Sequence, residues 1–99
     1  MWCLVIRIKK NDTAKGKRTS DLILDILKKG GILGATVWTG VDGYGIRGKS
    51  TLHIEGITIN MPLMMEAIDE LQKIEKVLPD IKELLHDNGL ITLHEVGVI

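Results

Sequence analysis

The sequence is poor in the residues that build covalent or metal-bound frameworks. Among its 99 residues it has one cysteine, two prolines and no phenylalanine. The lone Cys3 excludes an intrachain disulfide and a cysteine cluster for zinc or iron–sulfur binding. A chain without disulfides suits a reducing compartment, so we expect a cytoplasmic protein. The apolar run of residues 2–6 is interrupted by Arg7 and is far too short for a membrane span, so we expect no direct membrane insertion.

Net charge is also lacking, because 13 Lys and Arg residues balance 13 Asp and Glu residues. The two signs are separated along the chain. Residues 1–49 carry ten cations and four carboxylates, and residues 50–99 carry three cations and nine carboxylates. A general nucleic-acid coat needs uncompensated positive charge, so we expect no nucleic-acid partner. The asymmetry is compatible with a local anion site and with self-association.

Apolar residues, in contrast, make up 44% of the chain, which is enough for one hydrophobic core but not for two. We therefore expect a single domain over residues 1–99. Apolar and β-branched patterns predict strands over 2–8, 32–41 and 90–99. Apolar periodicity also predicts two helices, one capped by Thr19 or Ser20 and ending at Lys28–Gly31, the other with its apolar stripe from Leu71 to Leu85 and its end at Asn88–Gly89.

Two local features of the second half complicate this assignment. Residues 61–70 have strong helix propensity, but a strand over 63–69 completes a four-stranded sheet, and we choose the strand. Pro79 lies within the second helix, where its missing amide N–H predicts a kink or a fresh helical start. The resulting order βαββαβ predicts an α+β, ferredoxin-like fold, with a four-stranded antiparallel sheet and two helices on one face.

The predicted sheet is apolar on both faces. The first strand has one apolar row on each face, namely Trp2, Leu4, Ile6 and Ile8 on one and Cys3 and Val5 on the other. Two helices cover only one face, and a second apolar face is more often covered by another subunit than exposed to water. We therefore expect a closed homo-oligomer.

The segment from Gly40 to Ser50 is rich in glycine. Residues 43–50 match the Walker A pattern GxxxxGKS, and the first six of them also match GxGxxG. Both motifs bind phosphate only where a helix follows the loop, because the helix N-terminus supplies the amide groups. Residues 51–59 instead alternate in the manner of a strand, with no helical period. We therefore reject a P-loop or Rossmann site.

The glycines themselves are a candidate anion site. Those at positions 40, 43, 45, 48 and 56 can allow successive backbone N–H groups to point into one concavity, an anion nest. Arg47 and Lys49 would add positive charge to it. The alternative is a solvated hairpin tip, since glycine marks turns far more often than sites.

Other polar residues give weaker signals. No Ser/His/Asp or Cys/His set can be assembled, so we assign no catalytic residue. The histidines at positions 53, 86 and 94 lack the spacing of a metal site, so we assign no metal ligand. The basic residues within 9–18 are interpreted as a solvated loop, with phosphate contact as the alternative.

Several segments resemble the PII signal-transduction proteins. Gly34–Val37, Gly43–Gly45 and Glu55–Gly56 resemble the strand and the glycine-aromatic-glycine step that border the PII T-loop. Residues 62–70, 71–85 and 88–99 resemble the third strand, the second helix, and the B-loop with the last strand. The sequence is still more similar to a short uncharacterised PII-like family, through Gly-Ala-Thr-Val, Lys-Ile-Glu-Lys-Val-Leu-Pro and Gly-Leu-Ile-Thr-Leu-His-Glu-Val.

The resemblance implies a ferredoxin-like homotrimer with its sheets turned inward and an adenine-nucleotide site between subunits. By matching position, Thr36 would lie near the adenine. Gly43 and Gly45 would lie at the phosphate-facing base of a T-loop over residues 42–55, and Gly89 would lie in the B-loop.

This sequence departs from PII at several cations that contact phosphate. Leu90 follows the B-loop glycine where PII has lysine, and the C-terminal arginines of PII have no counterpart. Their loss removes charge-assisted contacts, which are the strong ones. Arg47 and Lys49, together with the lysines that end the first strand, are candidates to replace them; otherwise the ligand is a different anion. Gly48, between Arg47 and Lys49, is also a candidate ligand-binding residue.

We therefore predict a non-enzymatic PII-like regulator that binds a small anionic ligand between subunits and signals through the loop 42–55. The resemblance suggests a membrane transporter or another regulated protein as the partner. Two alternatives stay open. One is a small enzyme acting on a phosphate-containing substrate, with Arg47 as its anion clamp, and the other is a metal-binding trimer that uses His53 or His94.

Overall fold

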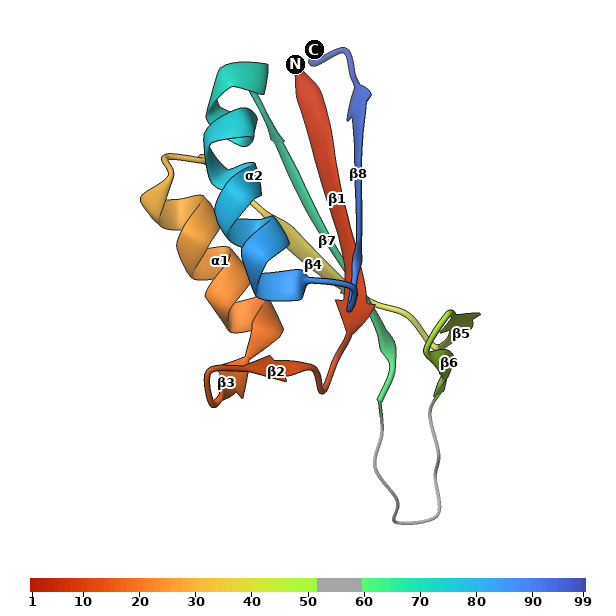
Figure 1. Cartoon of the computed structure of the whole chain (residues 1–99). Helices are drawn as coiled ribbons and strands as arrows, with labels where there is room; N and C mark the ends of the chain where they lie inside the picture. The colour runs from red at the N-terminus through yellow and green to blue at the C-terminus, as the bar shows by residue number, and fades with distance from the viewer. Residues whose placement is uncertain (52–59) are drawn as a thin grey trace.

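A computed structural model of the chain describes residues 1–51 and 60–99, with the backbone alone for residues 49–51. Four strands form an antiparallel sheet in the order β4-β7-β1-β8, with bounds Thr36–Thr39, Pro62–Asp69, Trp2–Lys9 and Leu90–Glu95. Two helices, α1 (Thr19–Lys29) and α2 (Leu71–Leu85), lie on one face of this sheet (Figure 1). Two short hairpins stand outside it, β2 (Thr13–Ala14) with β3 (Lys17–Arg18) and β5 (Asp42–Gly45) with β6 (Gly48–Thr51). The predicted α+β, ferredoxin-like fold is confirmed, and residues 52–59 of the alternating segment lie outside the described residues.

The core lies between the sheet and the two helices. The register places Leu4 and Ile6 of β1 opposite Ala67 and Met65 of β7, so all four side chains share one face. All four are buried against the apolar stripes of the helices. The most deeply buried helical side chains are Ile23, Ile74 and Ile81. The strand period of 2 and the helix period of 3.6 therefore account for the core.

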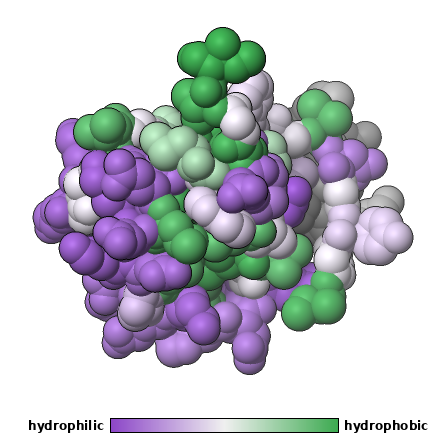
Figure 2. Space-filling model, turned by 90° about the horizontal axis from the view of Figure 1, so that it is seen from above, coloured by the Kyte–Doolittle hydropathy of each residue, from purple (hydrophilic) through white to green (hydrophobic). Residues whose placement is uncertain are grey.

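Within the described ranges, no helix covers the other face of the sheet (Figure 1). We call this the open face, and cross-strand pairing shows that it includes Cys3, Val5, Arg7, Thr36, Trp38, Met64, Glu66, Ile68, Leu90, Thr92 and His94. Three of its large apolar side chains are exposed, with 54% for Trp38, 43% for Ile68 and 56% for Leu90, whereas Cys3 and Val5 are buried. Hydrophilic residues instead gather over the helices, on the left of Figure 2. The second apolar row that the sequence predicted is therefore present.

Residues 62–69 form a strand despite their helix propensity. β7 hydrogen-bonds to β1 on one side and to β4 on the other. Its alternate residues Leu63, Met65 and Ala67 are buried against the helices. Helix propensities of ordinary residues differ by less than about 1 kcal/mol per residue. The hydrogen bonds to two neighbouring strands and the burial of three side chains therefore outweigh the helix preference of this segment. The predicted strand over 63–69 is confirmed.

The predicted strand over 32–41 is too long at both ends, since β4 covers only Thr36–Thr39. At its start, the Leu33 N–H donates to Oδ2 of Asp69 at 3.1 Å instead of joining the ladder. At its end, the Gly40 N–H donates to the Pro62 carbonyl at 2.7 Å, but Pro62 has no N–H to return the bond. The chain therefore leaves the sheet here and enters the segment that forms the candidate site.

The two C-terminal elements also differ from prediction. β8 ends at Glu95 rather than at residue 99, because Glu95 pairs with Trp2, where β1 begins. α2 runs as one helix with Pro79 inside it, so no new helix starts there. Pro79 is exposed, opposite the buried stripe of α2. Because proline has no N–H, the carbonyl four residues before it lacks its helical donor, and water can bond that carbonyl instead.

A tight turn precedes α1 where the sequence predicted only a polar loop. The β2–β3 hairpin turns at Lys15 and Gly16, whose φ values of 54° and 76° suit a type I′ turn. The predicted side-chain cap at residue 19 or 20 is wrong. Arg18 occupies the cap position, and the Thr19 N–H donates to the Asp12 carbonyl at 2.9 Å. Asp12 is thus fixed beside the start of α1.

Candidate ligand-binding site

The glycine-rich segment forms a hairpin that stands apart from the main sheet (Figure 1). β5 and β6 pair in antiparallel fashion, from Asp42 opposite Thr51 to Gly45 opposite Gly48. Only two residues lie between the strands, and Gly48 has a φ of 91°, which residues with a side chain rarely adopt. The segment that follows the tip is therefore a strand, in agreement with the rejection of a P-loop.

The hairpin differs from the anion nest that the glycines suggested. Residues 42–45 and 48–51 pair across two strands, whereas a nest needs successive amides with right- and left-handed backbone in turn. Of the described glycines between 40 and 48, only Gly48 has a positive φ. Gly56 lies outside the described residues. Side chains are therefore the better candidates for contact with an anion.

Arg47, at the hairpin tip, joins three segments that are far apart in the sequence. Its Nη1 donates to Oδ1 of Asp12 at 3.0 Å, and its Nη2 donates to Oδ2 of Asp12 at 2.8 Å, which makes a bidentate ion pair. Nη2 also donates to the Asn88 carbonyl at 2.8 Å. Arg47 thereby ties the hairpin to the turn after β1 and to the loop between α2 and β8. The predicted anion clamp is thus paired with a carboxylate of the chain itself.

Asp12 is held in place by the turn that contains it. Its Oδ2 accepts the Lys9 N–H at 3.0 Å, and its own N–H donates to the Lys9 carbonyl at 3.1 Å. Partial burial acts to raise the pKa of Asp12, but hydrogen bonds from Arg47 and the Lys9 amide outweigh it and lower the pKa below its ordinary value. Hydrogen bonding to Asp12 in turn raises the pKa of Arg47. Both partners are therefore ionised at neutral pH.

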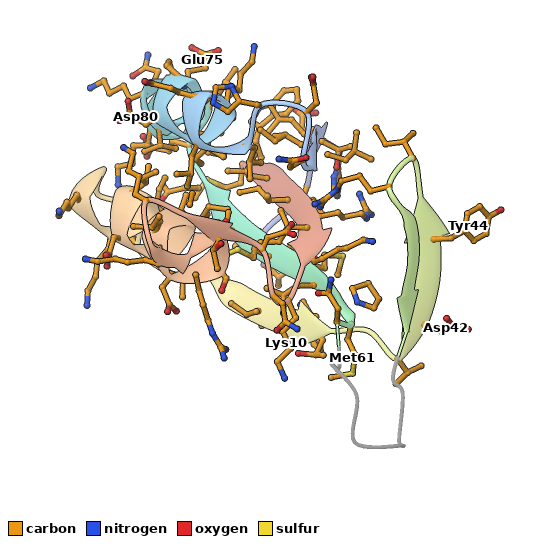
Figure 3. The ribbon with its side chains drawn as sticks, turned by 60° about the horizontal axis from the view of Figure 1, so that its bottom comes forward. Lys10, Asp42, Tyr44, Met61, Glu75 and Asp80 are labelled. Carbon is orange, nitrogen blue, oxygen red and sulfur yellow. The ribbon has the colours of Figure 1, made fainter. Side chains whose placement is uncertain are left out.

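A cavity of about 420 Å³ lies between this hairpin and the adjacent end of the sheet. Its lining comes from the end of β1, the hairpin, the start of β7, the α2–β8 loop and the start of β8. It consists of Arg7, Ile8, Lys9, Gly43, Tyr44, Gly45, Ile46, Arg47, Pro62, Asp87, Asn88, Gly89 and Leu90. Figure 3 shows the hairpin at one side of the molecule, with the Tyr44 side chain directed away from the body. The volume lies within the range of small-molecule sites.

Four of the predicted ligand-binding residues line this cavity, namely Gly43, Gly45, Arg47 and Gly89. Gly89 lets the α2–β8 loop approach β1 closely. A Cβ at this position would lie 3.0 Å from Cδ1 of Leu85 and 3.1 Å from the Arg7 carbonyl oxygen. The B-loop position predicted by resemblance is therefore a wall of the cavity.

Three other predicted residues are not among the described lining. Thr36 lies on β4 opposite Glu66, on the open face. Gly48 closes the hairpin turn opposite Gly45. Lys49 pairs with Tyr44 through its backbone, and its side chain lies outside the described residues. The predicted set is thus divided between the cavity, the open face and the hairpin.

Sequence reasoning missed one cation of the cavity, Arg7, and left Lys9 within a group of loop cations. Both come from β1 and line the cavity. Arg7 Nη1 donates to Oγ1 of Thr92 at 3.5 Å, and Lys9 Nζ donates to the Arg47 carbonyl at 3.4 Å. The signal was available, because Arg7 is the only charged residue between positions 2 and 8. A charge in a central strand points to a specific environment for that side chain.

Across residues 1–51 and 60–99, no three His, Cys, Asp or Glu side chains gather in a way that could hold a metal ion. Of the two histidines in the metal hypothesis, His94 lies on the open face and His53 lies outside the described residues. In the same part of the chain, neither helix has the length and apolar character of a membrane span.

A protein-family model matches residues 1–98 of the chain. It is that of DUF190, described as "Uncharacterized ACR, COG1993". A UPF0166 protein of Methanocaldococcus jannaschii is 37% identical over 95 residues, which cover 96% of this chain and 88% of the relative. A UPF0166 protein of Aquifex aeolicus is 35% identical over 91 residues, which cover 91% of this chain and 85% of the relative.

Solved structures with the same fold include CPII, a nitrogen regulatory PII-like protein from Thiomonas intermedia. Its structure bound to ADP, AMP and bicarbonate has a TM-score of 0.78 at 17% identity, covering 98% of this chain and 86% of that chain. Its structure bound to ADP and bicarbonate has a TM-score of 0.69 at 17% identity, covering 99% and 89%. At this identity the likeness establishes the fold alone. The chain belongs to the DUF190 family, and its fold is that of the PII-like proteins.

Proposed function

We propose that this protein is a non-enzymatic PII-like regulator that binds a small anionic ligand, such as an adenine nucleotide, in the cavity beside the hairpin. The observation that carries this proposal is the presence of Arg7, Lys9 and Arg47 around one cavity of about 420 Å³. Guanidinium groups bind phosphate and carboxylate groups through paired, charge-assisted hydrogen bonds. The ADP and AMP bound to CPII, which shares the fold, support the choice of adenine nucleotides as the ligands to test.

The apolar part of the lining suits a nucleobase. Ile8, Ile46, Pro62 and Leu90 line the same cavity as the three cations. Small-molecule sites commonly combine apolar walls with a few polar groups that fix orientation. A ring packed on these side chains, with its phosphate directed to the cations, would use both parts of the lining.

The open face supports assembly as a homotrimer with the sheets turned inward. Its exposed apolar side chains, Trp38 and Ile68 among them, are the kind that subunit contacts bury. Arg7 and Leu90 belong both to the open face and to the cavity lining. A subunit packed on the open face would therefore lie at the edge of the cavity. The ligand would then sit in a cleft between subunits.

The hairpin is the proposed signalling arm, as part of the loop 42–55. Tyr44 on β5 is 89% exposed and Ile46 at the tip is 96% exposed, so both offer surface to another protein. A ligand that takes Arg47 from Asp12 would favour a different position of the hairpin. The regulated protein would read that position, and a membrane transporter is the partner that the sequence resemblance suggested.

Calorimetry with AMP, ADP, ATP and cyclic adenine nucleotides tests the ligand. We expect saturable binding by the wild-type protein and at least about tenfold weaker binding by an Arg7→Gln, Arg47→Gln double variant, which loses two charge-assisted contacts. Lys76→Gln, on the exposed side of α2, removes a charge remote from the cavity and should bind like wild type. If no adenine nucleotide binds a folded wild-type protein, the nucleotide part of the proposal is wrong.

Light scattering after size-exclusion chromatography tests the assembly. We expect three times the chain mass for the wild-type protein, and a smaller mass for Trp38→Glu, which would bury a carboxylate in the interface. A monomeric wild-type protein would contradict the assembly, and with it the placement of the ligand between subunits.

A further inference from the structure

The ion pair between Asp12 and Arg47 bears on which anions the cavity can accept. The guanidinium of Arg47 has five N–H donors. Two are directed at the Asp12 carboxylate, and Nη2 also donates to the Asn88 carbonyl. The Asp12 side chain is only 16% exposed and is not part of the cavity lining, whereas Arg47 is. An anion in the cavity therefore meets an arginine that already has a carboxylate partner.

The formal charges of the described residues give the size of this effect. The lining has three cations, Arg7, Lys9 and Arg47, and one carboxylate, Asp87. Asp12, which is ion-paired with Arg47, adds a second carboxylate at 2.8 Å. Among these five described groups, three cations against two carboxylates leave one net positive charge. Without Asp12 the net charge would be two.

An anion gains from this charge and loses its hydration when it enters the cavity. The attraction grows in proportion to the charge of the anion, whereas the cost of removing the anion from water grows with the square of that charge. A site with one net positive charge is therefore matched best by an anion with one or two negative charges. A triphosphate would bring more negative charge than the lining compensates.

We propose that Asp12 is a specificity-determining residue, which restricts the cavity to anions with one or two negative charges by neutralising Arg47. The class of ligand selected is a phosphate monoester or diester, such as a nucleoside monophosphate, in preference to di- and triphosphates. The proposal rests on the anion-binding function proposed above. Asp12 acts through Arg47 and need not touch the ligand.

A series of inorganic anions tests this selectivity without the contribution of a base. Orthophosphate, pyrophosphate and tripolyphosphate are titrated by calorimetry at constant ionic strength into wild type and Asp12→Asn. Asparagine suits the test because its amide oxygen can still accept the Lys9 N–H. Wild type should bind tripolyphosphate no more tightly than orthophosphate. Asp12→Asn should raise the ratio of the two affinities, tripolyphosphate to orthophosphate, by at least about tenfold, because a repulsive charge near the anion is gone.

Asp80→Asn is the matched control, because it removes the same charge from an exposed position of α2, away from the hairpin (Figure 3). Its affinity ratio should equal that of wild type. The proposal is overturned if wild type prefers tripolyphosphate by about tenfold or more, or if Asp12→Asn leaves the ratio unchanged or shifts it no more than Asp80→Asn does.

The outcomes separate this proposal from the proposed function. If the inorganic series behaves as expected but no adenine nucleotide binds, the nucleotide function fails and the role of Asp12 stands. If nucleotides bind but the ratio does not respond to Asp12→Asn, only the role of Asp12 fails. If no anion binds to the folded protein, both fail. Should Asp12→Asn not fold, the wild-type series still decides, because a clear preference for tripolyphosphate contradicts the proposal.

Discussion

Asp69 and Asp12 each accept a backbone N–H and pair with a cation, but their surroundings differ. The Asp69 side chain is 3% exposed, at the junction of β7 and α2. It accepts the Glu70 N–H at 2.8 Å and the Leu33 N–H at 3.1 Å, while Lys73 Nζ lies at 3.6 Å. The Asp12 side chain is 16% exposed and accepts two hydrogen bonds from Arg47, at 3.0 and 2.8 Å. The Arg47 side chain is itself 33% exposed.

The difference indicates what each carboxylate holds in place. Asp69 accepts two partly buried backbone hydrogen bonds and joins the α1–β4 connection to the start of α2, so its loss would leave both amides without this partner. Asp12 holds the side chain of a hairpin residue, which can take another anion or water as its partner. The first carboxylate therefore serves the fold, and the second serves the position of the hairpin.

The largest expected effect is that of removing Asp69. Asp69→Ala should lower the free energy of unfolding by about 2–4 kcal/mol, because it leaves the Leu33 and Glu70 amides without their acceptor. Asp12→Ala should cost about 1 kcal/mol or less, as expected of a partly exposed ion pair. Urea unfolding of both variants checks the comparison. Equal losses of unfolding free energy would show that Asp69 contributes no more to the stability of the fold than Asp12 does.

The part of the molecule that Asp69 supports was largely predictable from sequence. Alternation along β1 correctly divided Leu4 and Ile6 from Cys3 and Val5, because pleating sends successive side chains to opposite faces. The strand over 63–69 was also predictable, but only from the need to complete a sheet. Local propensity alone would have given a helix there.

The ends of elements and the contacts of the site were not predictable in this way. β4 begins late because of the bond from the Leu33 N–H to Asp69, and these residues are 36 positions apart. Arg47 was selected from the sequence as a candidate site residue, and it lines the cavity, but its pairing with Asp12 spans 35 positions. Neither contact produces a periodic pattern among neighbouring residues from which it could be predicted. Such side-chain pairs depend on how the finished fold brings distant turns together.

The dependence of stability on acidic pH distinguishes Asp69 from Asp12 further. Hydrogen bonding to the Glu70 amide, opposed by burial but aided by Leu33 and Lys73, lowers the pKa of Asp69 in the folded state. A lowered folded-state pKa stabilises the fold above the ordinary carboxyl value of about 3.9, and this stabilisation is lost as pH falls below it. The pKa of Asp12 is lowered too, but there burial is the largest influence and opposes the shift.

We therefore expect Asp69→Asn to flatten the loss of stability between neutral pH and about pH 2 more than Asp12→Asn does. Unfolding midpoints in urea, measured from pH 7 down to pH 2, test this expectation. An acid limb unchanged by Asp69→Asn would mean that this carboxylate has a similar pKa in the folded and unfolded chains, and the contrast with Asp12 would lose its electrostatic basis.

The smallest effect on stability, and the most local one, is expected for Arg47→Gln. Global unfolding should change by about 1 kcal/mol or less, because the ion pair that is lost is partly exposed. The amides of residues 42–48 should nevertheless exchange with solvent about fivefold faster, since this anchor of the hairpin to Asp12 and Asn88 is gone. Amides of β7 should exchange as in wild type. Faster exchange confined to the hairpin would show that the hairpin opens independently of the sheet that supports it, whereas unchanged exchange would mean that the hairpin keeps its place without Arg47.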